Sequence, residues 1–312
     1  MAPGKNKLKN HMRRKPSVAH FIIGFYRLWH GHLHLKGAGG LIRWAAPYTH
    51  GLQKFPLNLP EGQTVTVDFR DPAAFFWLNH LMGDRFQEDG LLDAIQSLAN
   101  SDAVIWDVGA NSGVLSYRLA VWARNQRIRL HSFEPNPTVF SMARAALAPF
   151  PAVHVHNCAL SDSNTVLTLN IPREGSACAS LEAAATEPNM RVDVRCQRGD
   201  SLAEEDGIPM PDIIKIDTEG HELKVIAGLP KIIAEKKPLI FFENLSLTDE
   251  AILANTPAGY ELYSVGNENG ELRSGIHRVL GHNCLFAPIS ANLGATKLRD
   301  KSQPTASPHS PT

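Results

Sequence analysis

The sequence predicts an α/β fold, in which a mostly parallel sheet carries helices on both faces and an N-terminal extension precedes it. Apolar, strand-like runs alternate with helical patterns from about residue 100, which is typical of parallel strands joined by right-handed crossovers. The runs at 212–217 and 238–243 are near-continuously apolar, as expected of strands covered on both faces. The hydrophobic share of 43% suffices for a buried core and excludes a wholly disordered chain.

The predicted elements follow from apolar spacing. Residues 103–109 form a short apolar run that ends in an acid and a glycine, and residues 112–124 follow with apolar side chains at helical intervals. Before residue 100 the pattern is less regular, with one clearly alternating strand at 63–69. Further strands are predicted at 127–133, 153–160, 164–170, 192–197, 212–217, 238–243, 259–265 and 283–289, and further helices at 138–147, 219–227, 231–237 and 248–255.

Composition divides the chain into four parts. Residues 1–17 are basic and almost without large apolar side chains, so we expect a disordered terminus. Residues 18–99 are predicted to form an N-terminal extension or cap, and residues 100–290 the main α/β domain. Residues 291–312 are rich in Pro, Ser and Thr and lack core-forming residues, which predicts a disordered tail.

Charge is unevenly distributed along a chain whose formal net charge is zero. Residues 1–60 contain ten Lys or Arg and no acid before Glu61, which leaves 21 basic and 31 acidic residues in the remainder. This asymmetry indicates that the N-terminal part meets an anionic partner, with a solvated chain end as the alternative. The acidic body has no basic stripe interleaved with aromatic residues, which argues against a nucleic-acid partner.

Targeting and membrane signals are weak. No stretch of about 18 apolar residues exists, so we expect no membrane-spanning helix. The short run at 18–29 is interrupted by His20 and Arg27, which fits a helix docked on the core better than a signal peptide, and peripheral membrane contact stays an alternative. Four scattered cysteines fit a reducing compartment, so we expect a cytoplasmic protein, with membrane association as the alternative.

The loop after the strand 103–109 has the sequence Asp107-Val108-Gly109-Ala110-Asn111-Ser112-Gly113. In open α/β sheets ligands bind beyond the carboxyl ends of strands, where the next helix start offers free N–H groups. The G-x-x-x-G spacing differs from the G-x-G-x-x-G of dinucleotide sites, which argues against NAD. The loop suits S-adenosylmethionine, which has no pyrophosphate. Asp107 could then accept a hydrogen bond from its amine, and the loop N–H groups could hold its carboxylate.

The next two strand ends extend this candidate site. Glu134 stands 27 residues after Asp107 and could accept hydrogen bonds from both hydroxyls of a ribose, as the equivalent acid does in NAD enzymes. A solvated acid at the strand end is the alternative, and the register with the glycine loop favours the ribose contact. The third strand ends at Asn157 to Asp162, beside Glu134 in sheet geometry, where an adenine would lie.

Five segments together resemble the FkbM family of S-adenosylmethionine-dependent methyltransferases. These are WDVGANSG, HSFEPNP, NCALSD, IIKIDTEGHELKVIAG and PLIFFE, spread over roughly residues 100–290, and the part from Lys215 to Glu222 is the most specific. The resemblance implies a Rossmann-like class I methyltransferase fold, with a seven-stranded sheet whose last strand is antiparallel. It also implies methylation of hydroxyl oxygens on sugars, glycolipids, polyketides or other secondary metabolites.

The resemblance also implies which residues bind the cofactor S-adenosylmethionine. Matching motifs place Asp107, Gly109, Asn111 and Gly113 at its methionine end, Glu134 at the ribose, and Asn157, Ala159 and Leu160 near the adenine. Ala110 and Asn136 complete the predicted cofactor-binding set. Trp106 is bulkier than usual for the family, and His221 fills a variable position. Nothing before residue 100 matches, so the acceptor stays open.

The catalytic residues are expected at the end of the strand 212–217. Methyl transfer from a sulfonium mainly needs alignment, but an alcohol acceptor must also lose a proton to a nearby base. In a doubly wound sheet, the first and fourth strands are neighbours, which brings Asp217 beside the glycine loop. We rank Asp217 first as base, Glu219 second and His221 third, because a helix start would stabilise the Glu219 charge and His221 could point outward. Helix capping and a solvated helix face are the alternatives.

We also expect specific contacts for three side chains near these candidates. Lys215 lies in a buried-looking strand and should have an acidic partner, since a buried charge is costly when unpaired. Glu243 and Asn244 face the same sheet edge and could bind a polyol or amine. We expect no metal, since Asp217, Glu219 and His221 would diverge around a helix start. The residues His30, His32 and His34 lack a completing acid or cysteine nearby.

The leading hypothesis is therefore an O-methyltransferase acting on a hydroxylated small molecule or glycan. N-methylation of a small metabolite is the second hypothesis, because the fold does not dictate the acceptor atom. A catalytically silent cofactor-binding scaffold is the third, and the intact acidic segment from Asp217 to Glu222 argues against it.

Overall fold

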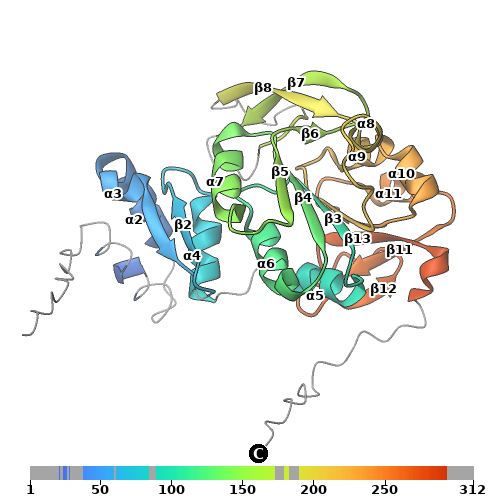
Figure 1. Ribbon diagram of the computed structural model, residues 1–312, viewed down its shortest axis with the longest axis horizontal. Coiled ribbons are helices and arrows are strands. Elements are labelled where there is room, and N and C mark those ends of the chain that lie inside the picture. The colour runs from blue at the N-terminus through green and yellow to red at the C-terminus, as the bar shows by residue number, and fades with distance from the viewer. Residues whose placement is uncertain are drawn as a thin grey trace, which may run out of the picture.

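The computed structural model describes residues 21, 24–26, 28, 38–59, 61–83, 89–172, 179–182 and 190–293. The predicted disordered terminus, the histidines at 30, 32 and 34, and all but the first residues of the predicted tail lie outside these described residues. A large twisted sheet occupies the centre of the molecule, and the elements before residue 83 lie to one side of it (Figure 1).

The central sheet has eight strands in the order β12-β11-β13-β10-β9-β3-β4-β5. Strands β5, β4, β3, β9 and β10 run parallel, whereas β13 is antiparallel to both of its neighbours. Seven strands were predicted, and the eighth is the three-residue edge strand β12. The strands are β3 (Val104–Val108), β4 (Arg129–Phe133), β5 (Val153–His156), β9 (Ile213–Ile216), β10 (Leu239–Glu243), β11 (Tyr260–Val265), β12 (Leu272–Ser274) and β13 (Asn283–Pro288).

Helices cover both faces of this sheet, as the apolar strands predict. Trp106 and Phe242 are fully buried on one face against α8–α11, and Ile105 and Phe241 are fully buried on the other against α5 and α6. Five consecutive buried residues in β3 follow from this double cover. The helices are α5 (Asp89–Leu98), α6 (Val114–Trp122), α7 (Pro137–Leu147), α8 (Gly199–Glu204), α9 (Glu222–Ala227), α10 (Pro230–Glu235) and α11 (Asp249–Ala254), with short 3₁₀ turns η3 (Ala123–Asn125) and η5 (Ile289–Ala291).

A second, three-stranded sheet has the order β6-β8-β7, with β6 (Ala159–Leu160), β7 (Thr165–Ile171) and β8 (Met190–Gln197). The single strand predicted at 153–160 is therefore wrong. The chain turns at Asn157, whose side-chain amide donates to the Glu134 and Pro135 carbonyls at 2.8 and 3.0 Å, and it then enters the smaller sheet. Alternating hydrophobicity cannot show such a change of partner strand.

The helix predicted at 219–227 begins three residues later, at Glu222. Glu219 and Gly220 have φ values of +55° and +104°, so the chain forms a tight loop there instead of a helical turn. The buried Glu222 carboxylate accepts from the Thr218 and Gly220 N–H groups at 2.9 and 3.1 Å. This local hydrogen bonding competes with helical hydrogen bonds, so the helix begins further along the chain.

The N-terminal elements form a hairpin with helices around it. The strand predicted at 63–69 is confirmed as β2, which pairs with β1 through the register Phe55↔Val67. Trp77 is fully buried in an apolar cluster that also contains Tyr117 of α6 and Tyr26, so this part packs directly on the main domain. The elements are α2 (Ala38–Ala45), η2 (Ala46–Tyr48), α3 (His50–Gln53), β1 (Phe55–Asn58), β2 (Thr64–Val67) and α4 (Ala74–Met82).

Truncating Trp77 should therefore destabilise the whole protein. We expect Trp77→Ala to lower the free energy of unfolding by about 3–5 kcal/mol, as is usual for a large buried aromatic side chain. Phe76→Ala on the same helix is the matched control, because Phe76 is partly exposed and should lose far less. Urea unfolding followed by circular dichroism measures both. Equal midpoints for the two variants would show that α4 is not an integral part of the fold.

Candidate active site

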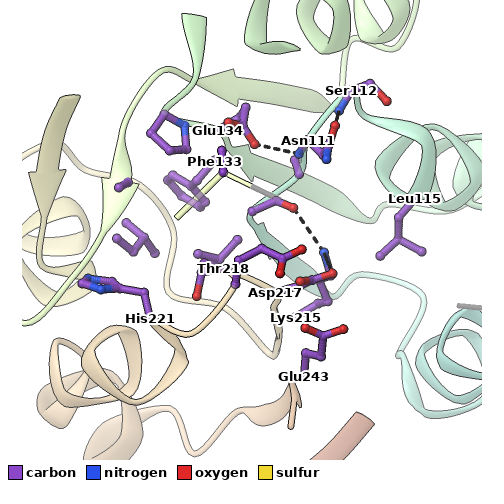
Figure 2. Close-up of a pocket in the computed structure, with 18 of the residues that line it drawn as sticks. Asn111, Ser112, Leu115, Phe133, Glu134, Lys215, Asp217, Thr218, His221 and Glu243 are labelled. Atoms are coloured by element: carbon purple, nitrogen blue, oxygen red, sulfur yellow. Dashed lines mark hydrogen bonds and ion pairs between the residues drawn. The ribbon is translucent and has the colours of Figure 1, made fainter. Parts of the chain in front are cut away.

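A cavity of about 340 Å³ opens at the carboxyl ends of β3, β4, β9 and β10. This is the switch point of the sheet, where crossovers leave β3 and β9 in opposite directions and ligands of open α/β sheets bind. Its volume lies in the range of small-molecule sites. Figure 2 shows Glu134 and Asn111 on one side of the cavity, and Asp217, Lys215 and Glu243 grouped on the other.

The glycine loop forms one wall and is held from two directions. The Gly109 and Ala110 N–H groups both donate to the Phe133 carbonyl at 3.0 Å, which fixes the loop to the end of β4. Gly109 has a φ of +78°, and a Cβ at this position would lie 1.7 Å from the Asp217 carbonyl oxygen. Only glycine therefore allows the loops after β3 and β9 to touch. From outside, the Trp77 indole donates to the Ser112 carbonyl at 3.2 Å.

Glu134 is held rigidly at the end of β4. Its Oε2 accepts from the Asn111 N–H and its Oε1 from the Asn136 N–H, both at 2.8 Å. Burial raises its pKa to about 7, although these two backbone donors favour the ionised form. A carboxylate oxygen has two lone pairs, so each Glu134 oxygen can accept a further hydrogen bond from a ligand hydroxyl.

Lys215 has the acidic partners that its burial requires. The parallel register places Lys215 directly opposite Asp107 on β3, and its Nζ lies 3.2 Å from Asp107 Oδ1 and 3.6 Å from Asp217 Oδ2. The ammonium also donates to the Gly109 carbonyl at 3.3 Å. The fully buried Asp107 also accepts a hydrogen bond at its Oδ2 from the Ser116 hydroxyl at 2.6 Å. One buried cation thus links the glycine loop with the loop after β9.

Three carboxyl groups gather on the Lys215 side of the cavity. Burial, and then the nearby Asp217 and Glu219 charges, raise the pKa of Glu243 to about 8. Desolvation, followed by the charges of Asp217 and Glu222, raises the pKa of Glu219 to about 7, an effect that solvent access to its side chain weakens. The positive charge of Lys215 opposes both shifts. Raised carboxyl pKa values near neutrality are typical of proton-transfer sites.

His221 closes the cavity on a third side. Its buried imidazole contacts Glu182 Oε1 through Nδ1 at 2.7 Å and Ser161 Oγ through Nε2 at 2.9 Å. Both ring nitrogens are therefore engaged within the protein. These contacts tie the residues 179–182 and the end of β6 to the start of α9, beside the apolar lining that Leu160, Leu169, Ala179 and Leu181 provide.

Nine of the thirteen sequence-predicted site residues line the cavity: Gly109, Ala110, Asn111, Glu134, Ala159, Leu160, Asp217, Glu219 and His221. Four predicted residues lie behind it. Asp107 is sealed off by Lys215 and Ser116. The Asn136 N–H donates to the Glu134 carboxylate, and the Asn157 side-chain amide donates to the Glu134 carbonyl. Gly113 approaches α7, where a Cβ would meet Ala143 at 3.0 Å. The structure thus gives these four a supporting position, and their contact with a cofactor stays a prediction.

Sequence reasoning missed several lining residues. Phe76 reaches the cavity from α4, and His282 and Asn283 reach it from the start of β13. No local pattern marks these residues, because only the folded chain brings them to the switch point. Thr218 was passed over although it lies between two predicted catalytic residues.

The family of the chain follows from comparison with known proteins. Residues 107–277, which contain the glycine loop, Glu134 and the segment from Lys215 to Glu222, match the methyltransferase FkbM domain. The chain belongs to this family. The match begins at the first residue of the glycine loop and covers more than half of the chain, so the resemblance read from the five segments is confirmed.

Curated relatives are more distant. The chain is 28% identical over 144 residues to the hexuronic acid methyltransferase AglP of Haloferax volcanii, covering 46% of this chain and 56% of the relative. It is 26% identical over 149 residues to the 2-O-methyltransferase NoeI of Sinorhizobium fredii, covering 43% and 60%. A crystal structure of methyltransferase FkbM from Methylobacillus flagellatus KT superposes with a TM-score of 0.42 at 16% identity, covering 67% of this chain and 52% of that one. The aligned regions thus span less than two thirds of the two curated relatives.

Neutralising Glu243 should stabilise the protein at alkaline pH. A carboxyl whose pKa is raised from 4.5 to about 8 keeps its proton in the folded state, so stability falls as pH rises through that window. Glu243→Gln should raise the free energy of unfolding by roughly 1–2 kcal/mol at pH 8.5, after allowance for solvent screening, and change little near pH 4. The control Glu268→Gln alters an exposed turn residue. Thermal midpoints at both pH values test this, and a gain independent of pH would refute it.

Proposed function

We propose that this protein is an S-adenosylmethionine-dependent O-methyltransferase that acts on a hydroxyl of a sugar or another polyhydroxylated metabolite. The observation that carries this proposal is the arrangement of the cavity. A rigid acceptor of hydroxyl hydrogen bonds, Glu134, lies on one side, and carboxyl groups with raised pKa values lie on the other, with the glycine loop between them. Family membership supplies the reaction class.

The described residues fit S-adenosylmethionine. Glu134 keeps lone pairs for two ribose hydroxyls, and the apolar lining of Ala159, Leu160 and Leu169 suits a purine ring. Gly109, Ala110 and Asn111 present the glycine loop to the methionine end. When bound, S-adenosylmethionine supplies an electrophilic methyl group on a positively charged sulfur. The acidic residues on the Lys215 side would favour that charge.

The same residues indicate how an acceptor hydroxyl would react. Bound S-adenosylmethionine would supply the methyl group to the acceptor oxygen, the carbon–sulfur bond would break with its electron pair staying on sulfur, and the hydroxyl proton would pass to a protein base. The Asp217 carboxylate forms an ion pair with Lys215, so it is less free to accept the hydroxyl proton. We therefore place Glu219, whose pKa is raised to about 7, first as base and Asp217 second. His221 holds the cavity wall through both ring nitrogens, which favours a positioning role.

Two lining features suit a sugar-like acceptor. Phe76 presents an aromatic ring at the cavity, and Glu243, which holds its proton near neutral pH, can donate a hydrogen bond to a ring hydroxyl. AglP and NoeI, the relatives described above, are named for a hexuronic acid and for a 2-O position. An acceptor carried on a lipid would also bring the enzyme to a membrane surface, where the basic residues before Glu61 suit anionic headgroups.

Calorimetric titration tests the cofactor. We expect S-adenosylmethionine to bind and NAD not to bind, and Glu134→Gln to weaken the affinity at least tenfold, since a carboxamide cannot accept the same hydrogen bonds. Glu268→Gln should bind as the parent protein does. Binding of NAD, or an unchanged affinity in the folded Glu134 variant, would refute the cofactor assignment.

Transfer of an isotope-labelled methyl group tests the base. With methyl glycosides of hexuronic acids and neutral hexoses as acceptors, Glu219→Gln should lower kcat about 10²-fold or more while S-adenosylmethionine affinity stays the same. The rate should rise with pH and level off above about 7, because the base must be deprotonated and its pKa is raised to about 7. A Glu219→Gln enzyme with full kcat would eliminate this residue as the base, and methylation of amines alone would eliminate the hydroxyl acceptor.

A further inference from the structure

The segment of α2 and η2 carries apolar side chains on two opposite sides. Ile42 and Ala46 point inward and are fully buried in the same cluster as Leu52. Leu41, Trp44 and Tyr48, spaced three and four residues apart, point outward and are 46%, 70% and 82% exposed. A surface helix normally has one apolar face toward the core. Packing on the core therefore does not account for the outward stripe of Leu41, Trp44 and Tyr48.

This outward stripe is a continuous surface. The Trp44 and Tyr48 rings lie 6.1 Å apart in a tilted arrangement, and Leu41 precedes Trp44 by one helical turn. Exposed apolar side chains are also concentrated in this part of the molecule. Among the described residues, five of the twelve large apolar side chains that are exposed belong to the segment up to Tyr48: Phe21, Leu28, Leu41, Trp44 and Tyr48.

The sequence that contains the stripe is basic. Arg43 on α2 and Lys54 after α3 are exposed, and the first 60 residues hold ten basic side chains and no acid. The remaining chain has ten more acids than bases. An anionic surface would thus attract the N-terminal part and repel the body. Figure 1 shows α2 and α3 at one end of the molecule, beyond β2 and α4.

We propose that the outward stripe docks this protein on an anionic lipid bilayer. Trp and Tyr rings favour the headgroup level of a membrane, where their apolar bodies and polar groups are both satisfied, and Leu41 reaches the acyl boundary. The basic residues contact lipid phosphates. The proposed contact is peripheral, because the stripe lies on the surface of a folded segment. Across the described residues, no helix has the length and hydropathy of a membrane span. The docking stands independently of methyl transfer, because it uses none of the cavity residues.

Vesicle co-sedimentation of the full chain tests the docking. We expect binding to vesicles of phosphatidylglycerol and phosphatidylcholine, weaker binding at high salt, and little binding to phosphatidylcholine alone. The double variant Trp44→Ser/Tyr48→Ser should bind about tenfold more weakly. Leu253→Ser is the matched control, because Leu253 is a 60% exposed apolar residue on α11. It should bind as the parent protein does. Circular dichroism and thermal unfolding confirm that each variant is folded.

A measurement on the parent protein guards against variants that fail to fold. Brominated acyl chains should quench Trp fluorescence on binding, and Trp44→Phe, which keeps an aromatic ring, should bind normally but lose that quenching. Absence of binding to anionic vesicles, or equal binding by the parent and the Trp44→Ser/Tyr48→Ser variant, would overturn the proposal. Light scattering that shows a dimer in the parent and a monomer in that variant would assign the stripe to a second copy of the chain instead. None of these readouts depends on methylation. A negative result would therefore count against membrane docking and would leave the proposed function untested by it.

Discussion

The Lys215 ammonium is the constraint on which the site depends. A buried, unpaired ammonium costs several kcal/mol, so the sheet must bring negative or carbonyl oxygens to it. Asp107 comes from the strand register, Asp217 from the loop directly after β9, and the Gly109 carbonyl from the glycine loop. The same cation draws together a strand, the glycine loop and the loop after β9. Its position also explains why Asp107 is turned inward, behind the cavity lining.

The carboxyl groups of the cavity divide into two kinds by their surroundings. Glu134 is fixed by two backbone N–H donors, so its two oxygens have defined directions. For Glu219 and Glu243, burial and then the nearby like charges raise the pKa values, which makes proton exchange near neutral pH accessible. One kind suits recognition of a hydroxylated ligand, and the other suits proton transfer. One edge of the sheet supplies both kinds of carboxyl group, because the carboxyl ends of the parallel strands all lie at that edge.

Local patterns predicted the fold, and most of the site residues that they singled out line the cavity. The differences have physical causes. The strands β3, β9 and β10 are recognisable because burial on both faces requires near-continuous apolar runs. The start of α9 was misplaced because Glu222 bonds back to Thr218 and Gly220, a contact that periodicity does not register. Phe76, His282 and Asn283 could not be found, since they join the cavity only through packing of distant elements. The pairing of Lys215 was predictable from the cost of an isolated buried charge.

The close approach of Gly109 to the Asp217 carbonyl limits how this scaffold can be redesigned. A loop that determines acceptor choice could be transplanted from another enzyme of the family only if its backbone carbonyl occupies the same place. Conversely, any side chain introduced at Gly109 would push the transplanted loop outward and shift both ends of the cavity together. The two loops are therefore one unit for protein engineering, and the sites open to independent change lie further out, at Phe76 and at the start of β13.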